Sequence, residues 1–195
     1  MERAAPRPIL TNLPNVLTYA RILCVPAVVA CLFFYTGDFG RWMALAVYII
    51  ACITDWLDGY VARVWQQQST LGRMLDPIAD KLLVGTTLLM LVHDNTIIGV
   101  NIWAAVIILC REILVSGLRE FLAELNVRIR VTQLAKWKTT MQMIALGVLL
   151  AGPAGDRVVP GVWDVGMVLL WFAALLTLWT GYDYLKAAVR HAVER

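Results

Sequence analysis

Long apolar runs separated by short polar connections make up most of the hydrophobic pattern of this chain. A helix needs about 20 apolar residues to cross the hydrocarbon core of a bilayer. Six runs approach that length, with approximate bounds 17–36, 42–62, 77–93, 97–120, 137–152 and 162–185. The pattern therefore predicts an all-α, polytopic membrane helix bundle with six transmembrane helices, in a single domain over residues 1–195.

The stretch Pro8 to Thr18 precedes the first run and is too polar to span a membrane. Its scattered apolar residues are compatible with a short N-terminal interfacial helix, which would lie on the membrane surface. A solvated tail explains the same pattern equally well. Both interpretations therefore stay open for this segment.

Composition and charge agree with a lipid environment. Hydrophobic residues make up 60% of the chain and charged residues 16%, whereas soluble domains carry about 25% charge. The net charge of +3 is too small to suggest a nucleic-acid binder. All seventeen Lys and Arg residues except Arg41, Arg157 and the intramembrane Arg111 lie on the termini, on alternate connections or on their flanks. The positive-inside rule then predicts that both termini are cytoplasmic.

Four aspartates interrupt the ends of the second and third runs: Asp55, Asp58, Asp76 and Asp80. Charges inside membrane helices are costly, so a cluster of them suggests a function. Asp55 and Asp58 are three residues apart and share a helix face. Gly59 continues that face almost without a side chain, as does Ala62, which leaves room for a bulky polar ligand against the backbone.

Gly72, Asp76 and Asp80 step by four and share one face if the third helix already includes residue 72. An alternative is that Asp76 is a helix N-cap followed by Pro77 at the first helical position. That alternative explains one aspartate, whereas four crowded carboxylates repel one another unless cations neutralise them. Hard oxygen ligands favour two ions of Mg²⁺ or Mn²⁺, and the absence of nearby His or Cys disfavours zinc.

Two divalent cations between two helices are suited to an in-line displacement at phosphorus. One carboxylate would then take a proton from the attacking hydroxyl. Asp80 is the best candidate for this base, because it is last in the stripe and deepest toward the membrane.

The segment from Asp55 to Arg63, together with Gly72, Asp76 and Asp80, resembles the signature of the CDP-alcohol phosphatidyltransferase family at all eight fixed positions. The resemblance implies a six-helix bundle, usually a homodimer, with the site open to the cytoplasmic leaflet. It implies that Asp55, Asp58 and Asp76 bind metal and that Asp80 both binds metal and acts as the base. It also implies that the CDP-lipid lies against four residues: Gly59, Ala62, Arg63 and Gly72.

A second group of polar residues lies in the fourth and fifth runs. Arg111 is about halfway along the fourth run, where an arginine is expected to face a polar cavity. Because guanidinium and ammonium groups bind phosphate well, we expect a pocket for an anionic acceptor formed by Arg111, Arg119, Lys136 and Lys138. The alternative is a purely structural pairing of Arg111 with an acid on another helix.

A narrower resemblance, to bacterial family members that use sn-glycerol 3-phosphate as acceptor, rests on Asn12-Leu-Pro14-Asn15, on Arg111-Glu112-Ile and on the Lys136 to Gln142 segment. It implies transfer from CDP-diacylglycerol with release of CMP, in anionic phospholipid biosynthesis at the bacterial inner membrane. Another family member, such as a cardiolipin synthase, stays open as an alternative. A divalent-cation transporter would instead need carboxylates near the midplane or in rings along a pore.

Overall fold

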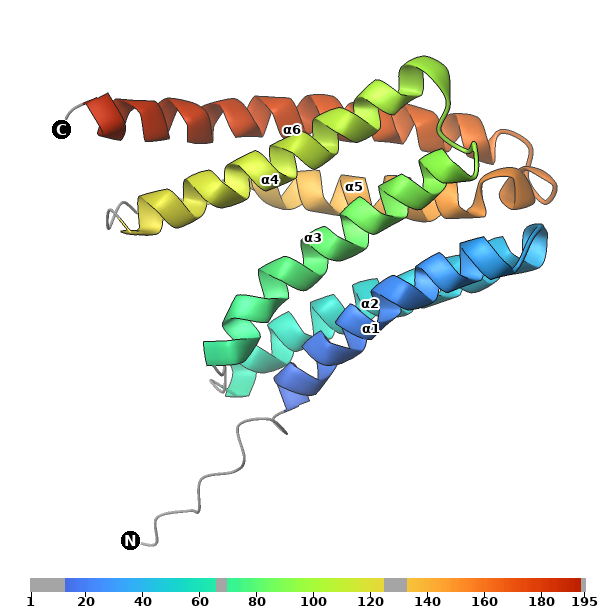
Figure 1. Cartoon of the computed structure of the whole chain (residues 1–195), viewed down its shortest axis with the longest axis horizontal. Coiled ribbons are helices and arrows are strands. Elements are labelled where there is room, and N and C mark those ends of the chain that lie inside the picture. Colours follow the sequence, from blue (N-terminus) through green and yellow to red (C-terminus); the bar gives the residue numbers. More distant parts are fainter. Residues whose placement is uncertain (1–12, 66–69, 125–132, 194–195) are drawn as a thin grey trace, which may run out of the picture. The chain divides into compact units, whose positions relative to one another are not determined.

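The computed structural model describes residues 13–65, 70–124 and 133–193, and this part of the chain is helical apart from short connections. Figure 1 labels the α-helices in chain order. Their bounds, with one short 3₁₀ helix, are α1 Leu13–Phe34, α2 Asp38–Trp65, α3 Thr70–His93, η2 Gly99–Asn101, α4 Ile102–Glu124, α5 Gln133–Asp156 and α6 Val162–Val193. The predicted all-α architecture with six long helices is thus confirmed.

Four helices contain stretches long and apolar enough to cross a membrane: Asn15–Phe34, Asp38–Leu57, Gly99–Leu122 and Val162–Lys186. The chain is therefore a polytopic membrane protein. α3 and α5 have 24 residues each, or about 36 Å at 1.5 Å per residue. They are therefore long enough to cross a membrane, but they are less apolar than the other four helices. Asp76, Asp80 and Lys81 interrupt α3, and polar residues such as Gln142 interrupt α5. Six spans stay a prediction.

The structure describes only part of the N-terminal stretch Pro8 to Thr18. The described part of the Pro8 to Thr18 stretch, from Leu13 onward, is continuous with α1. It does not form a separate interfacial helix, because α1 runs as one helix from Leu13 to Phe34, with Pro26 inside it. Residues 8–12 lie outside the described part of the chain.

The chain divides into two compact units, residues 1–90 and 91–195. In the first unit, α1 and α2 form a hairpin and pack along their length. Gly37, with φ of 86°, turns the chain between them. Ala44, Tyr48 and Ala51 are buried on α2, and the two alanines allow the helices to approach closely.

α3 begins at Thr70, well before Asp76. The N-cap interpretation of Asp76 and Pro77 is therefore wrong, because both residues lie inside the helix. Pro77 has no backbone N–H, so it removes one helical hydrogen bond at that point. The condition for a shared face is met, since Gly72, Asp76 and Asp80 all belong to the same helix.

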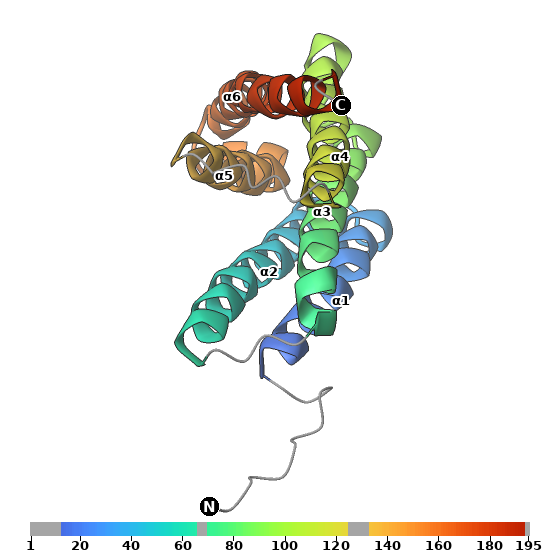
Figure 2. The same ribbon diagram turned by 90° about the vertical axis from the view of Figure 1, so that its left-hand side faces the viewer.

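In the second unit, α6 packs against both α5 and α4, as Figures 1 and 2 show from two directions. Its core contains Leu146 and Leu149 of α5 with Leu170 of α6, all fully buried. Two tryptophans of α6 fix the chain before α4: Trp163 Nε1 donates to the carbonyl of Thr96 at 2.9 Å, and Trp171 Nε1 donates to the Asn101 side chain at 2.9 Å.

Gly40 generates the first testable prediction. A Cβ at this position would lie 2.0 Å from the backbone oxygen of Tyr35, which cannot move without opening the α1–α2 turn. We expect Gly40→Ala to lower the free energy of unfolding by about 1–3 kcal/mol or more. Gly117→Ala on α4 is the matched control, because nothing lies within 4 Å of its added Cβ and helix propensity favours alanine by about 1 kcal/mol. Thermal unfolding in detergent compares the two, and equal melting temperatures would contradict the prediction.

Candidate active site

Three helices of the first unit meet at one guanidinium group. Nη1 of Arg21 on α1 lies 2.7 Å from Oδ1 of Asp55 on α2 and 2.7 Å from Oδ1 of Asp76 on α3. The Arg21 side chain is 1% exposed, whereas the Asp55 and Asp76 side chains are 34% and 48% exposed. The arginine is thus buried beneath a pair of carboxylates that stay accessible.

Helix register explains why these carboxylates lie together. Asp55 ends the apolar part of α2, and Asp76 and Asp80 follow each other by one turn on α3. Ala79, between Asp76 and Asp80 in the sequence, is fully buried. Asp80 is partly exposed.

The remaining signature residues of α2 are described only in their backbone. Asp58 follows Asp55 by three residues on the same helix, so the two share a face. The side chains of Asp58, Ala62 and Arg63 and the surroundings of Gly59 lie outside the described part of the structure. Their predicted roles are therefore untested.

The donor set at this position suits a hard divalent cation. It consists of carboxylate oxygens, which Mg²⁺ and Mn²⁺ prefer, and the Arg21 guanidinium shows that positive charge is accommodated between Asp55 and Asp76. Among the side chains that the structure describes, no group of three or more His, Cys, Asp or Glu residues lies close enough together to hold a metal ion. The side chain of Asp58 is not among them.

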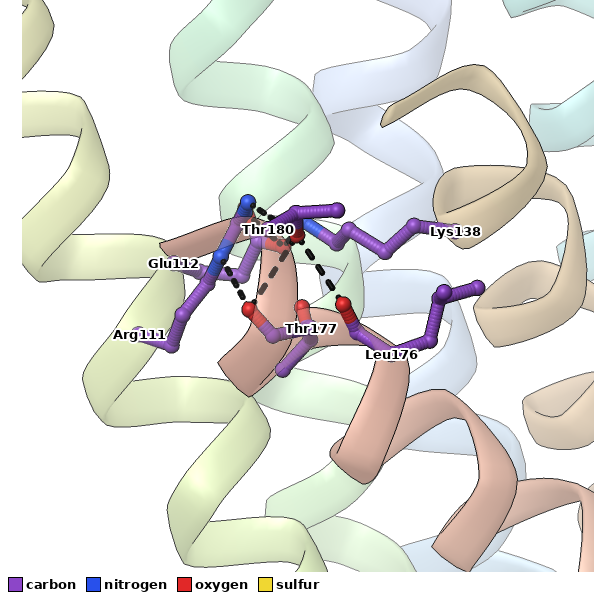
Figure 3. A network of polar contacts seen from close by, with 6 residues as sticks. All are labelled: Arg111, Glu112, Lys138, Leu176, Thr177 and Thr180. Atoms are coloured by element: carbon purple, nitrogen blue, oxygen red, sulfur yellow. Dashed lines mark hydrogen bonds and ion pairs between the residues drawn. The ribbon is translucent and has the colours of Figure 1, made fainter. Parts of the chain in front are cut away.

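A second polar network lies in the other unit, where α4, α5 and α6 meet (Figure 3). Arg111 is 7% exposed. Its Nε donates to the carbonyl of Thr177 at 3.0 Å, and its Nη2 donates to the Thr180 hydroxyl at 2.9 Å. Nη1 lies 3.4 Å from Glu112, a carboxylate that also forms an ion pair with Nζ of Lys138. One carboxylate therefore serves two buried cations.

Small residues on α6 make room for this arginine. A Cβ added at Gly181 would lie 3.2 Å from Cγ of Arg111, so a larger side chain would push the arginine stem aside. Arg119, two turns further along α4, is exposed and lies over the ring of Tyr184, 5.7 Å from its centroid. Lys136 is in α5, but its side chain is outside the description.

The structure thus brings two of the four predicted acceptor residues together, Arg111 and Lys138, through Glu112. The sequence left two interpretations of Arg111 open, an acceptor pocket or a pairing with an acid on another helix, and neither described its surroundings fully. Its acidic partner is the next residue of the same helix, and its partners on another helix are a carbonyl and a hydroxyl of α6.

Sequence reasoning counted Arg21 among the cytoplasmic topology residues and within the narrower resemblance, but gave it no role in the site. The signal was present, because Arg21 lies inside the apolar stretch Asn15–Phe34, as Arg111 lies inside Gly99–Leu122. Thr177 and Thr180 carried no comparable signal, since threonine is common in membrane helices.

Comparison with known proteins identifies the family. The model that describes CDP-alcohol phosphatidyltransferases matches residues 11–179. A protein of Rickettsia typhi, named CDP-diacylglycerol–glycerol-3-phosphate 3-phosphatidyltransferase, is 45% identical over 91% of this chain and 97% of its own length. Proteins of the same name from Rickettsia prowazekii and Haemophilus influenzae are 46% and 38% identical, over 90% and 91% of this chain and 94% and 93% of their own lengths. This chain is therefore an enzyme of the CDP-alcohol phosphatidyltransferase family.

Proposed function

We propose that this enzyme transfers the phosphatidyl group of CDP-diacylglycerol to sn-glycerol 3-phosphate, giving phosphatidylglycerophosphate and CMP. The observation that carries the proposal is its similarity, at 36–46% identity over about nine-tenths of the chain, to relatives named for that donor and acceptor. Family membership also speaks against the transporter alternative.

In this proposal Asp55, Asp58, Asp76 and Asp80 hold two Mg²⁺ or Mn²⁺ ions. When bound, such ions neutralise the charge of a diphosphate and of the leaving phosphate. Gly59, Ala62, Arg63 and Gly72 lie against the cytidine diphosphate, since three of these positions have almost no side chain.

Asp80 accepts the proton of the primary hydroxyl of glycerol 3-phosphate. The hydroxyl oxygen forms a bond to the phosphorus that carries diacylglycerol, the phosphoanhydride bond breaks, and CMP leaves with the bonding electrons. Asp80 is suited to this role because it is partly exposed and one turn from Asp76.

The acceptor phosphate binds Arg111 and Lys138, with Lys136 and Arg119 adding positive charge. The contacts of Arg111 support a role in binding the phosphate. Nε and Nη2 are engaged with α6, while Nη1 makes the longest contact, 3.4 Å to Glu112. Nη1 and Lys138 can therefore exchange Glu112 for phosphate oxygens while Arg111 stays anchored.

Two further buried oxygens belong to residues that neighbour these cations: Gln142 follows Lys138 on α5, and the carbonyl of Thr177 accepts a hydrogen bond from Arg111. Oε1 of Gln142, one turn after Lys138, and Oγ1 of Thr177 have no hydrogen-bond partner among the described residues. Both residues are at least 97% buried, and a buried acceptor without a donor is costly. The hydroxyl groups of a glycerol moiety supply donors of the required kind.

We further propose that α3 and α5 also span the membrane, that both termini and the active site are cytoplasmic, and that the enzyme is a homodimer in the bacterial inner membrane. The distribution of Lys and Arg supports the orientation. Labelling of a terminal cysteine by an impermeant reagent outside intact cells would reverse it, and a monomeric mass in nanodiscs would exclude the dimer.

An acceptor panel tests the proposed function. The purified enzyme, given CDP-diacylglycerol and Mg²⁺, is expected to release CMP rapidly with glycerol 3-phosphate and very slowly with glycerol or serine, because only glycerol 3-phosphate offers a phosphate to the basic residues. Excess chelator is expected to abolish the release. A preference for phosphatidylglycerol as acceptor would assign cardiolipin synthesis instead.

Asp80→Asn is expected to reduce kcat by roughly 10²–10⁴-fold, the usual contribution of a general base. The KM for CDP-diacylglycerol should change only a few-fold, because the amide still fits the site. Asp164→Asn, at the exposed first turn of α6, is the control and should keep full activity. A loss confined to donor affinity would leave Asp80 with metal binding alone.

Arg111→Ala is expected to raise the KM for glycerol 3-phosphate by roughly 10–150-fold, since a hydrogen bond between charged groups contributes about 1.5–3 kcal/mol. Thr180→Val separates binding from stability. It removes the hydroxyl that accepts from Arg111 but no positive charge, so it should lower the melting temperature while that KM stays within a few-fold. If Arg111→Ala behaves like Thr180→Val, Arg111 is structural only.

A further inference from the structure

Arg21 lies between two of the aspartates that the proposed function assigns to metal binding. We propose that Arg21 is the built-in counter-ion of that site. It holds Asp55 and Asp76 together in the metal-free enzyme, and it leaves the two carboxylate oxygens that it contacts when a metal ion binds between them. The inference rests on the metal-binding part of the proposed function. It makes Arg21 a positioning residue that sets metal affinity.

The guanidinium and a metal ion would compete for the position between the two carboxylates. Nη1 is 2.7 Å from an oxygen of each carboxylate, so it fills the space between those two oxygens. A metal ion between those two oxygens would occupy the position that Nη1 holds, and two positive charges in contact repel each other. In the proposal, a metal ion that binds there therefore displaces the guanidinium.

The same geometry explains why the metal-free enzyme needs the arginine. Because Nη1 touches both oxygens, these lie no more than twice 2.7 Å from one another. Two ionised carboxylates this close repel unless a cation lies between them. Arg21 supplies that cation from a third helix, and it is itself 1% exposed, so it depends on the aspartates in turn.

Two opposite effects of removing Arg21 follow. The metal-free enzyme loses its internal cation and becomes less stable, whereas metal ions lose their competitor and bind more tightly. Charge-assisted hydrogen bonds correspond to roughly 10–150-fold in an equilibrium constant. Because Asp55 and Asp76 are 34% and 48% exposed, water weakens the interaction, and we expect the lower end, a gain of about 10-fold in metal affinity.

Mn²⁺ binding to the purified full-length protein in lipid nanodiscs tests the proposal. Free Mn²⁺ is followed by electron paramagnetic resonance, and the melting temperature is recorded with and without Mn²⁺. Arg21→Gln is expected to bind Mn²⁺ about 10-fold more tightly, to melt at a lower temperature without metal, and to gain more stability when Mn²⁺ is added. Unchanged or weaker Mn²⁺ binding would overturn the proposal.

Two further variants make the outcome decisive. Arg21→Lys keeps the charge without the planar fork, so it should bind Mn²⁺ more tightly than the wild type but less tightly than Arg21→Gln; if Arg21→Gln fails to fold, this variant decides by the same criterion. Arg41→Gln is the matched control, because Arg41 lies 14 residues before Asp55 on α2, about 21 Å along the axis. Its Mn²⁺ affinity should stay within twofold of the wild type.

The wild-type titration distinguishes failure of the metal site from failure of the counter-ion role alone. If the wild type binds no Mn²⁺, the metal site of the proposed function fails and the role of Arg21 fails with it. If the wild type binds Mn²⁺ and the Arg21 variants bind it equally or less well, the metal site stands and only the counter-ion role is overturned.

Discussion

A charged side chain inside an apolar helix must find its partners within the protein, because lipid offers none. Both units of this enzyme are organised around that constraint. In the first unit Arg21 satisfies it with Asp55 and Asp76, and in the second Arg111 satisfies it with Glu112, Thr177 and Thr180. Each arginine joins helices that are far apart in the sequence, so each pairing also fixes how those helices are rotated.

The two pairings have opposite electrostatic character, and the roles proposed for them rest on that difference. The first presents accessible carboxylates over a buried cation, which suits metal ions. The second places one carboxylate between two buried cations, which suits an anion that replaces it. In both places a side chain of the protein occupies a position that the proposed ligand would take. The resting enzyme thereby avoids uncompensated charge in a medium where it is costly.

Much of the fold could be predicted from the sequence because it depends on local pattern. Apolar runs identified all six long helices, and the spacing of Gly72, Asp76 and Asp80 indicated a shared face that the start of α3 at Thr70 confirms. The signature residues identified the family, which the comparisons confirm.

The partners of buried charges could not be predicted, because they depend on helix rotation and not on local pattern. The position of Arg111 in its apolar run shows that it is intramembrane. Only the packing of α6 shows that it donates hydrogen bonds to a carbonyl and a hydroxyl beside Gly181. Likewise, no local pattern links Arg21 to Asp55 and Asp76, which follow it by 34 and 55 positions. The N-cap interpretation of Asp76 failed for a related reason: a proline inside a helix and one at its start look alike in sequence.

The long sequence separation of the Arg21 ion pairs has a consequence for biogenesis. α1 leaves the ribosome first, and Asp76 is made 55 residues after Arg21. At about 5–20 residues per second, the arginine waits roughly 3–11 s for its second partner. An unpaired arginine disfavours insertion by about 2.5–3.5 kcal/mol at the centre of a membrane helix, and by less where Arg21 lies, about a third of the way along Asn15–Phe34. The nascent α1 should therefore remain beside the translocon until α2 and α3 arrive, so that the three helices enter the lipid together and the acidic site is assembled during insertion.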